Sequence, residues 1–113
     1  MIVRLLPEAK AELDKLPPAE AVAMSRVILK LAELGTDLLF PHHSGVRGSA
    51  GLRELRPRAG RSPWRALYRR VGDAFVVAAI APEAKVDRHS FNSAVQLAGE
   101  RLVAYVEREG GTV

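Results

Sequence analysis

The feature that most constrains the fold of this chain is an unbroken apolar run, AFVVAAIA, at residues 74–81. Its length and its small or β-branched side chains predict a β-strand, and the lack of polar alternation predicts that both faces of this strand are buried. Gly72 and Asp73 directly precede it and form a two-residue hairpin signal, because glycine adopts a positive φ without steric cost. The chain is therefore expected to contain a sheet in which at least one strand is covered on both sides.

Two further strands are predicted before this run, at residues 52–58 and 63–71, which completes an antiparallel meander. Eight arginines and one acidic residue, Glu54, lie between positions 47 and 70, whereas the rest of the chain has nine Lys or Arg and twelve Asp or Glu. The net charge of +4 is thus concentrated in the meander. Guanidinium groups bind phosphate oxygens in pairs and stack on bases, so this pattern indicates a surface for phosphate or another polyanion.

The remaining elements follow from apolar periodicity and from proline and glycine. Together they give an α+β fold with the order β-α-α-β-β-β-α. We expect a strand at residues 2–6, helices at 8–16 and 18–34 with Gly35 after the second, a loop at 36–50, and a last helix that begins at His89 or Ser90 with Ser90 as N-cap.

Composition excludes several classes of protein. With 113 residues and 48% apolar content, residues 1–113 are expected to form one domain around a single core. The chain has no cysteine, and it has neither an apolar run of about 18 residues nor a secretory signal, so a cytoplasmic protein that does not contact a membrane is expected. The adjacent His42 and His43 have no acid at ligand spacing, so we predict no metal site and no cofactor. These histidines either line a substrate groove or lie on the surface.

Short motifs in the meander carry a family resemblance. They are GLRELR at residues 51–56, WRALY at 64–68, and the upstream Pro41 and Gly48. In this order, with a helical hairpin before them and a helix after them, the chain resembles the RelE/ParE superfamily of bacterial toxins, and within it the HigB-like, phage-derived branch. The resemblance implies a RelE-like fold, with an arginine-rich meander packed against helices, and a toxin of a toxin–antitoxin pair.

The resemblance also implies partners. Many members of the superfamily enter the ribosomal A site and cleave the mRNA that is being translated. The neutralising antitoxin in the HigB-like branch is usually a helix-turn-helix DNA-binding protein. ParE-type members poison gyrase with the same fold, so fold alone does not determine the target.

Metal-free RNA cleavage requires three steps: deprotonation of a 2′-OH, stabilisation of charge on the phosphorane, and protonation of the 5′-oxygen. Arg65, which matches the arginine of the family motif in mid-strand, and Arg56 on the neighbouring strand are the candidates for charge stabilisation. Relatives often carry a lysine pair after the last strand, but this chain has APEA at residues 81–84. Lys85 and His89 are therefore the candidates for proton transfer. All four residues are also acceptable as ordinary strand, loop or cap residues.

Six other arginines are predicted to hold RNA without chemistry: Arg53, Arg58, Arg61, Arg69, Arg70 and Arg88. Glu54 is either a general base or the ion-pair partner of a neighbouring arginine, and we favour the ion pair. Trp64 and Tyr68 share the strand face opposite Arg65, where packing against the helices is favoured over base stacking.

Three functions compete at this point. The leading one is a ribosome-dependent mRNA endoribonuclease that inhibits translation and is neutralised by an antitoxin. The second is a member without nuclease activity, either a gyrase inhibitor or a decayed toxin that binds only its antitoxin, and the absent lysine pair favours it. The third is a basic accessory domain that binds RNA or DNA without chemistry.

Overall fold

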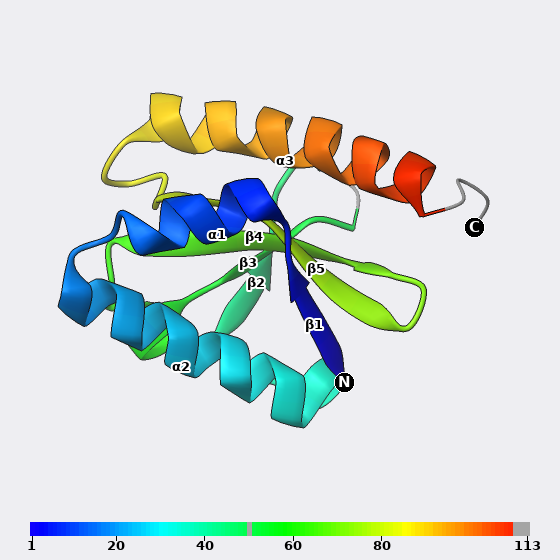
Figure 1. The fold of residues 1–113 in the computed structure, drawn as a ribbon. Coiled ribbons are helices and arrows are strands. Elements are labelled where there is room, and N and C mark those ends of the chain that lie inside the picture. The colour runs from blue at the N-terminus through cyan, green and yellow to red at the C-terminus, as the bar shows by residue number, and fades with distance from the viewer. Residues whose placement is uncertain (50, 110–113) are drawn as a thin grey trace.

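The structure is a computed structural model that describes residues 1–49 and 51–109. A five-stranded sheet with the order β1-β5-β4-β3-β2 lies between two helices on one side and one long helix on the other (Figure 1). The strands are β1 Ile2–Leu5, β2 His43–Gly45, β3 Arg53–Leu55, β4 Trp64–Val71 and β5 Ala74–Pro82. The helices are α1 Pro7–Asp14, α2 Pro18–Leu34 and α3 Arg88–Arg108, with short 3-10 segments η1 at Gly35–Asp37 and η2 at Pro57–Gly60. The predicted α+β class is confirmed.

Strand β5 has the central position that its composition predicts. Every residue from Ala74 to Ala81 is buried. It pairs with β1 in parallel and with β4 in antiparallel orientation across the Gly72 turn, where φ is +61°. The sheet is therefore mixed rather than a pure antiparallel meander.

Two apolar cores cover the two faces of the sheet. The core on the α1/α2 side contains Tyr68 and Phe75, whose ring centroids lie 5.7 Å apart in an edge-to-face arrangement, and Trp64 packs against it. The core on the α3 side contains Leu67 and residues of α3 such as Leu102. The packing predicted for Trp64 and Tyr68 is thus confirmed.

The pairing of β4 with β5 is irregular at one point. Leu67 pairs with Ala79, but the next residue, Tyr68, pairs with Val77, so Ala78 is an extra residue in β5. As a result, Ala78 and Ala79 both belong to the core on the α3 side. A bulge of this kind bends the strand and leaves backbone groups outside the ladder.

Two charged side chains bind backbone groups of β5 at and just beyond this bulge. Arg101 of α3 donates to the carbonyl of Ala78 at 2.9 Å, and Glu12 of α1 accepts from the backbone N–H of Ile80 at 3.0 Å. Arg101 and Glu12 also pair with each other, with an Nη2–Oε2 distance of 3.1 Å. This cluster connects α1, α3 and the part of β5 that extends beyond β1.

The helical predictions are close to the structure. Pro7 and Pro18 each stand in the first turn of their helices, and α2 ends before Gly35, which has a φ of +56°. The last helix begins at Arg88, one or two residues before the predicted start at His89 or Ser90, because Asp87 and not Ser90 is its N-cap. The Asp87 carboxylate accepts from the backbone N–H of Ser90 at 3.0 Å. None of the helices in the described ranges is long and apolar enough to cross a membrane.

Two predictions about the strands were wrong. The strand predicted at 52–58 ends at Leu55, since Pro57 has no N–H to donate to a ladder and Arg58 and Ala59 adopt positive φ within η2. The loop predicted at 36–50 contains most of η1 and the strand β2, which pairs with β3. The chain therefore has four strands between α2 and α3, where three were predicted. Ala50, also in that predicted loop, lies outside the described residues.

Candidate functional site

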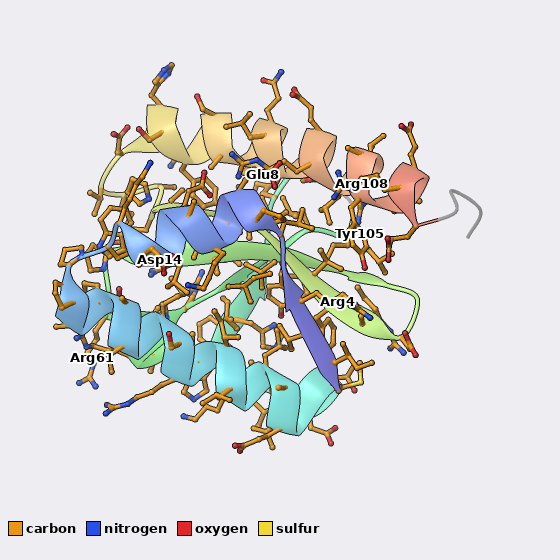
Figure 2. All side chains as sticks on the ribbon, viewed as in Figure 1. Arg4, Glu8, Asp14, Arg61, Tyr105 and Arg108 are labelled. Carbon is orange, nitrogen blue, oxygen red and sulfur yellow. The ribbon has the colours of Figure 1, made fainter. Side chains whose placement is uncertain are left out.

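The arginines of the meander do not form one patch, because the sheet divides them between its two sides. Arg53 pairs in register with Tyr68 on the α1/α2 side, and Arg58 and Arg61 line a cavity against α2. Figure 2 shows Arg61 beside α2, far from α3. Arg56 and Arg88, in contrast, line a cavity against α3. The predicted polyanion surface is thus two separate surfaces.

The cavity on the α3 side, which we call the α3 groove, has a volume of about 540 Å³ and lies between the β2–β3 pair and the first turns of α3. Its polar lining consists of Arg47, Glu54, Arg56, Arg88 and Asn92. Three arginines and a single carboxylate therefore line the same groove. This arrangement can hold a phosphate and offers one proton acceptor beside it.

The carboxylate of Glu54 holds Arg56 in place. Arg56 donates from Nε to Glu54 Oε1 at 2.8 Å, and its Nη2 lies 2.8 Å from the same oxygen. The ion pair favoured for Glu54 is confirmed. In the described part of the chain, Arg56 Nη1 and Glu54 Oε2 make no hydrogen bond, so the pair keeps one donor and one acceptor for a ligand.

Arg65 lies beneath the groove rather than in it. Its side chain is 5% exposed, and its Nη1 donates to the carbonyls of Ser62 and Trp64 at 2.7 and 2.9 Å. Its Nη2 pairs with Glu83, and its Nε lies 3.5 Å from Glu54 Oε1 without a hydrogen bond. A mid-strand arginine directed at substrate was expected, but this guanidinium is enclosed.

The enclosure of Arg65 has an electrostatic consequence. Burial lowers the pKa of its guanidinium, and the negative charges of Glu83 and then Glu54 act against that shift. An arginine stays protonated even so, because its ordinary pKa lies far above physiological pH. Arg65 therefore contributes a fixed positive charge that is directed at two carboxylates, one of which lines the α3 groove.

The two residues predicted for proton transfer are exposed and lie near the groove without lining it. Lys85 is in the loop before α3, and His89 is in the first turn of that helix. The residue that precedes each of them in the chain does line the groove: Ala84 precedes Lys85, and Arg88 precedes His89. The structure thus brings Arg56 and Arg88 together and leaves Lys85 and His89 at the margin.

On the α1/α2 side the predicted RNA-binding arginines are engaged within the protein. Arg53 donates to His43 Nδ1, with an Nε–Nδ1 distance of 3.1 Å, and the other ring nitrogen of His43 bonds the carbonyl of Leu38. Arg58 forms an ion pair with Glu20 of α2, which also accepts from Ser62 Oγ at 2.7 Å. His43 therefore has a structural contact, which sequence did not indicate.

Three of the remaining residues lie elsewhere. Arg69 is half-buried and Arg70 is exposed on β4, where Arg70 Nε donates to the carbonyl of Gly72 at 3.1 Å. His42 lines the cavity against α2, together with Arg61. None of these side chains lines the α3 groove.

An exposed aromatic side chain beside the groove, Phe40, was not predicted from the sequence. Phe40 is 71% exposed, and the guanidinium carbon of Arg56 lies over its ring, 5.6 Å from the centroid. Arg47 and Asn92 were also missed as groove residues. The only signal in the sequence for Phe40 is an apolar pair, Leu39 and Phe40, in a segment rich in turn residues.

Comparison with known proteins agrees with this fold. The family model described as phage derived protein Gp49-like matches residues 11–81. The chain belongs to this family. No curated protein sequence matches this Gp49-like chain.

Three solved structures with a similar fold come from two bacterial toxins and a toxin–antitoxin complex. RelBE2, a toxin–antitoxin complex from Mycobacterium tuberculosis, matches at 23% identity over 73% of this chain and 96% of the other, with a TM-score of 0.56. A mutant of the E. coli toxin RelE in its free state matches at 15% identity over 84% and 94%, with a TM-score of 0.59. A copper-bound mutant toxin from Helicobacter pylori matches at 16% identity over 76% and 98%, with a TM-score of 0.57. The Gp49-like chain thus has the RelE-like fold that the resemblance implied.

Proposed function

We propose that this Gp49-like protein is the toxin of a toxin–antitoxin pair and that it cleaves mRNA on the ribosome in the cytoplasm. The observation that carries the proposal is the α3 groove, which Arg47, Arg56 and Arg88 line together with Glu54, the carboxylate that Arg56 pairs with. The RelE toxin fold and a toxin neighbour in complex with its antitoxin support it. The proposed partner is an antitoxin with a helix-turn-helix DNA-binding domain.

The proposed reaction is attack of a ribose 2′-OH on the adjacent phosphate. The free Oε2 of Glu54 accepts the proton of the 2′-OH, and Arg56 stabilises the charge that develops on the phosphate oxygens. Arg88 and Arg47 hold neighbouring phosphates. Lys85 and His89, beside Arg88, are the groups proposed to protonate the departing 5′-oxygen.

In this proposal Arg65 is a positioning residue. Its charge is 3.5 Å from Glu54 and also paired with Glu83, so it fixes the carboxylate to which Arg56 is bonded. The position of the motif arginine is thereby explained without direct contact between Arg65 and RNA.

The test is primer extension on a defined mRNA with purified ribosomes, with and without the protein, next to a reaction that lacks ribosomes. We expect cuts that follow the reading frame and need ribosomes, and at least 100-fold fewer cuts with Glu54→Gln. Circular dichroism of the variant verifies that it is folded. Intact mRNA with folded wild-type protein would contradict the proposal.

One observation favours a second candidate, a family member that does not cleave RNA. The motif arginine, Arg65, is enclosed, and neither Lys85 nor His89 lines the groove. A protein of this kind would inhibit gyrase or bind only its antitoxin. The primer-extension assay separates the two candidates, since only the second predicts intact mRNA. A supercoiling assay with purified gyrase then distinguishes a gyrase inhibitor from a protein that binds only its antitoxin.

A further inference from the structure

Phe40 is exposed yet held in place. Around it, the N–H of His42 donates to the carbonyl of Leu39 at 3.0 Å, and the N–H of Arg56 donates to the carbonyl of His42 at 2.7 Å. Leu38 before it is 2% exposed and its carbonyl bonds the His43 ring. These contacts hold the backbone on both sides of Phe40 in place relative to Arg56.

The two faces of the Phe40 ring have different surroundings. Arg56 lies over one face, at 5.6 Å from the centroid, in the range of a cation–π contact. Because 71% of the residue is exposed, the other face is open to solvent. Leu39 is exposed to the same degree, 72%, but has no ring on which a base could stack. A general apolar docking patch would use both side chains, whereas a stacking platform would use only the ring.

Arg56 connects this ring to the α3 groove. Its Nε and Nη2 are bonded to Glu54, and its Nη1 has no partner in the described part of the chain. A phosphate at Nη1 would therefore lie on the edge of the guanidinium away from the carboxylate, and near the ring that the guanidinium covers. Unpaired bases of RNA are recognised by stacking on aromatic side chains next to cations that hold the backbone.

We infer that Phe40 and Arg56 form a nucleotide subsite at the margin of the α3 groove, in which an unpaired RNA base stacks on the open face of Phe40. The phosphate of that nucleotide accepts a hydrogen bond from Arg56 Nη1. The subsite rests on the proposed function in one respect, that the ligand of the groove is single-stranded RNA. It extends that function by assigning base contact to a residue outside the resembling motifs.

The experiment measures binding of a short 2′-O-methyl oligonucleotide, which lacks the attacking hydroxyl, by fluorescence anisotropy at low salt. A second oligonucleotide of equal length carries the same phosphates without bases. Phe40→Ala is expected to weaken binding of the first about tenfold and leave binding of the second unchanged. Leu39→Ala, with equal exposure, is the matched control and is expected to change neither.

Phe40→Trp supplies a direct signature of stacking. It is expected to bind the base-bearing oligonucleotide as tightly as the wild type, with its additional tryptophan fluorescence quenched, and to show no quenching with the abasic one. Equal affinities of wild type and Phe40→Ala for both oligonucleotides would overturn the subsite. So would equal losses from Phe40→Ala and Leu39→Ala, or a Phe40→Ala variant that loses its antitoxin but keeps its affinity for RNA.

These results are independent of cleavage on the ribosome. If wild-type protein cleaves mRNA but Phe40→Ala binds both oligonucleotides normally, the subsite is wrong and the endoribonuclease proposal stands. If binding depends on Phe40 and on bases but mRNA stays intact, the subsite stands and the cleavage proposal fails.

Discussion

The two sides of the sheet use the same residue type in different ways. On the α1/α2 side, Arg53 is bonded to His43 and Arg58 to Glu20, so their guanidinium groups serve the fold. On the α3 side, Arg56 keeps Nη1 available, and it lines the groove with Arg88. The difference shows that a local excess of charge in sequence does not define a binding surface; the partners of each charge do.

Arg65 is the most enclosed arginine described on the α3 side. It shares the strand face of Leu67, but it lies beneath the groove and has carboxylates and carbonyls around it. Replacing one partner of a buried ion pair leaves the other uncompensated, which is costly even where the intact pair contributes little. Arg65 is therefore part of the buried structure and also lies next to Glu54, which lines the α3 groove.

The largest effect is expected from Arg65→Ala, because Glu83 and Glu54 would lose their buried partner. We expect a loss of about 3 kcal/mol in the free energy of unfolding, measured by urea denaturation. Arg70→Ala, an exposed site on the same strand, is the control and should change stability by less than about 0.5 kcal/mol. Equal stability of Arg65→Ala and wild type would refute the structural role of the enclosure.

The second prediction compares one arginine from each side of the sheet. Arg56→Ala should lower ribosome-dependent cleavage about 100-fold, since it removes a donor aimed at developing charge. Arg58→Ala should leave cleavage within about threefold of wild type and lower stability by about 1 kcal/mol through loss of its bond to Glu20. Primer extension and urea denaturation measure the two quantities. A cleavage defect of similar size in both variants would mean that RNA contacts both sides.

Sequence predicted the parts of this fold that depend on local pattern. The apolar run of β5, the turn at Gly72, the helix ends at Pro18 and Gly35, and the pairing of Glu54 with an arginine all follow from neighbours in the chain. The strand β2 was missed because three residues, His43–Gly45, are too few to show alternation. The positive φ of Arg58 and Ala59 carries no signal either, since residues other than glycine rarely adopt it.

The site was less predictable because it depends on tertiary contacts. Alternation placed Arg65 opposite Trp64 correctly, but only the fold reveals that Glu83 and the carbonyls of Ser62 and Trp64 enclose it. Likewise, Phe40 and Arg56 are 16 positions apart, and no periodic pattern relates them. The role of each of these side chains depends on the residues that contact it in the folded protein, and these contacts have no local sequence pattern.

A smaller effect is expected on the salt dependence of RNA binding. If Arg88 contacts a phosphate, Arg88→Ala should reduce the slope of log affinity against log salt by about 1. Arg61→Ala, an exposed arginine on the α1/α2 side, should leave the slope unchanged. The measurement is anisotropy of a single-stranded oligonucleotide over a salt series. A reduced slope for Arg61→Ala would mean that RNA contacts the arginines on both sides of the sheet.

The smallest effect is expected on the pH dependence of stability, through Glu20 on the α1/α2 side. The bonds from Arg58 and then Ser62 hold the pKa of Glu20 below its ordinary value of 4.5. A carboxylate with a lowered pKa in the folded protein stabilises it at pH values above the unfolded pKa, and that contribution is lost as the pH falls through the folded pKa. The stability difference between wild type and Glu20→Gln should therefore be constant from pH 7 to about 5 and shrink below about 4.5, as measured by urea denaturation. A difference that persists unchanged at pH 3 would mean that Glu20 acts by shape rather than by charge. Because Glu20 pairs only on the α1/α2 side, the same substitution should leave cleavage at pH 7 unaltered.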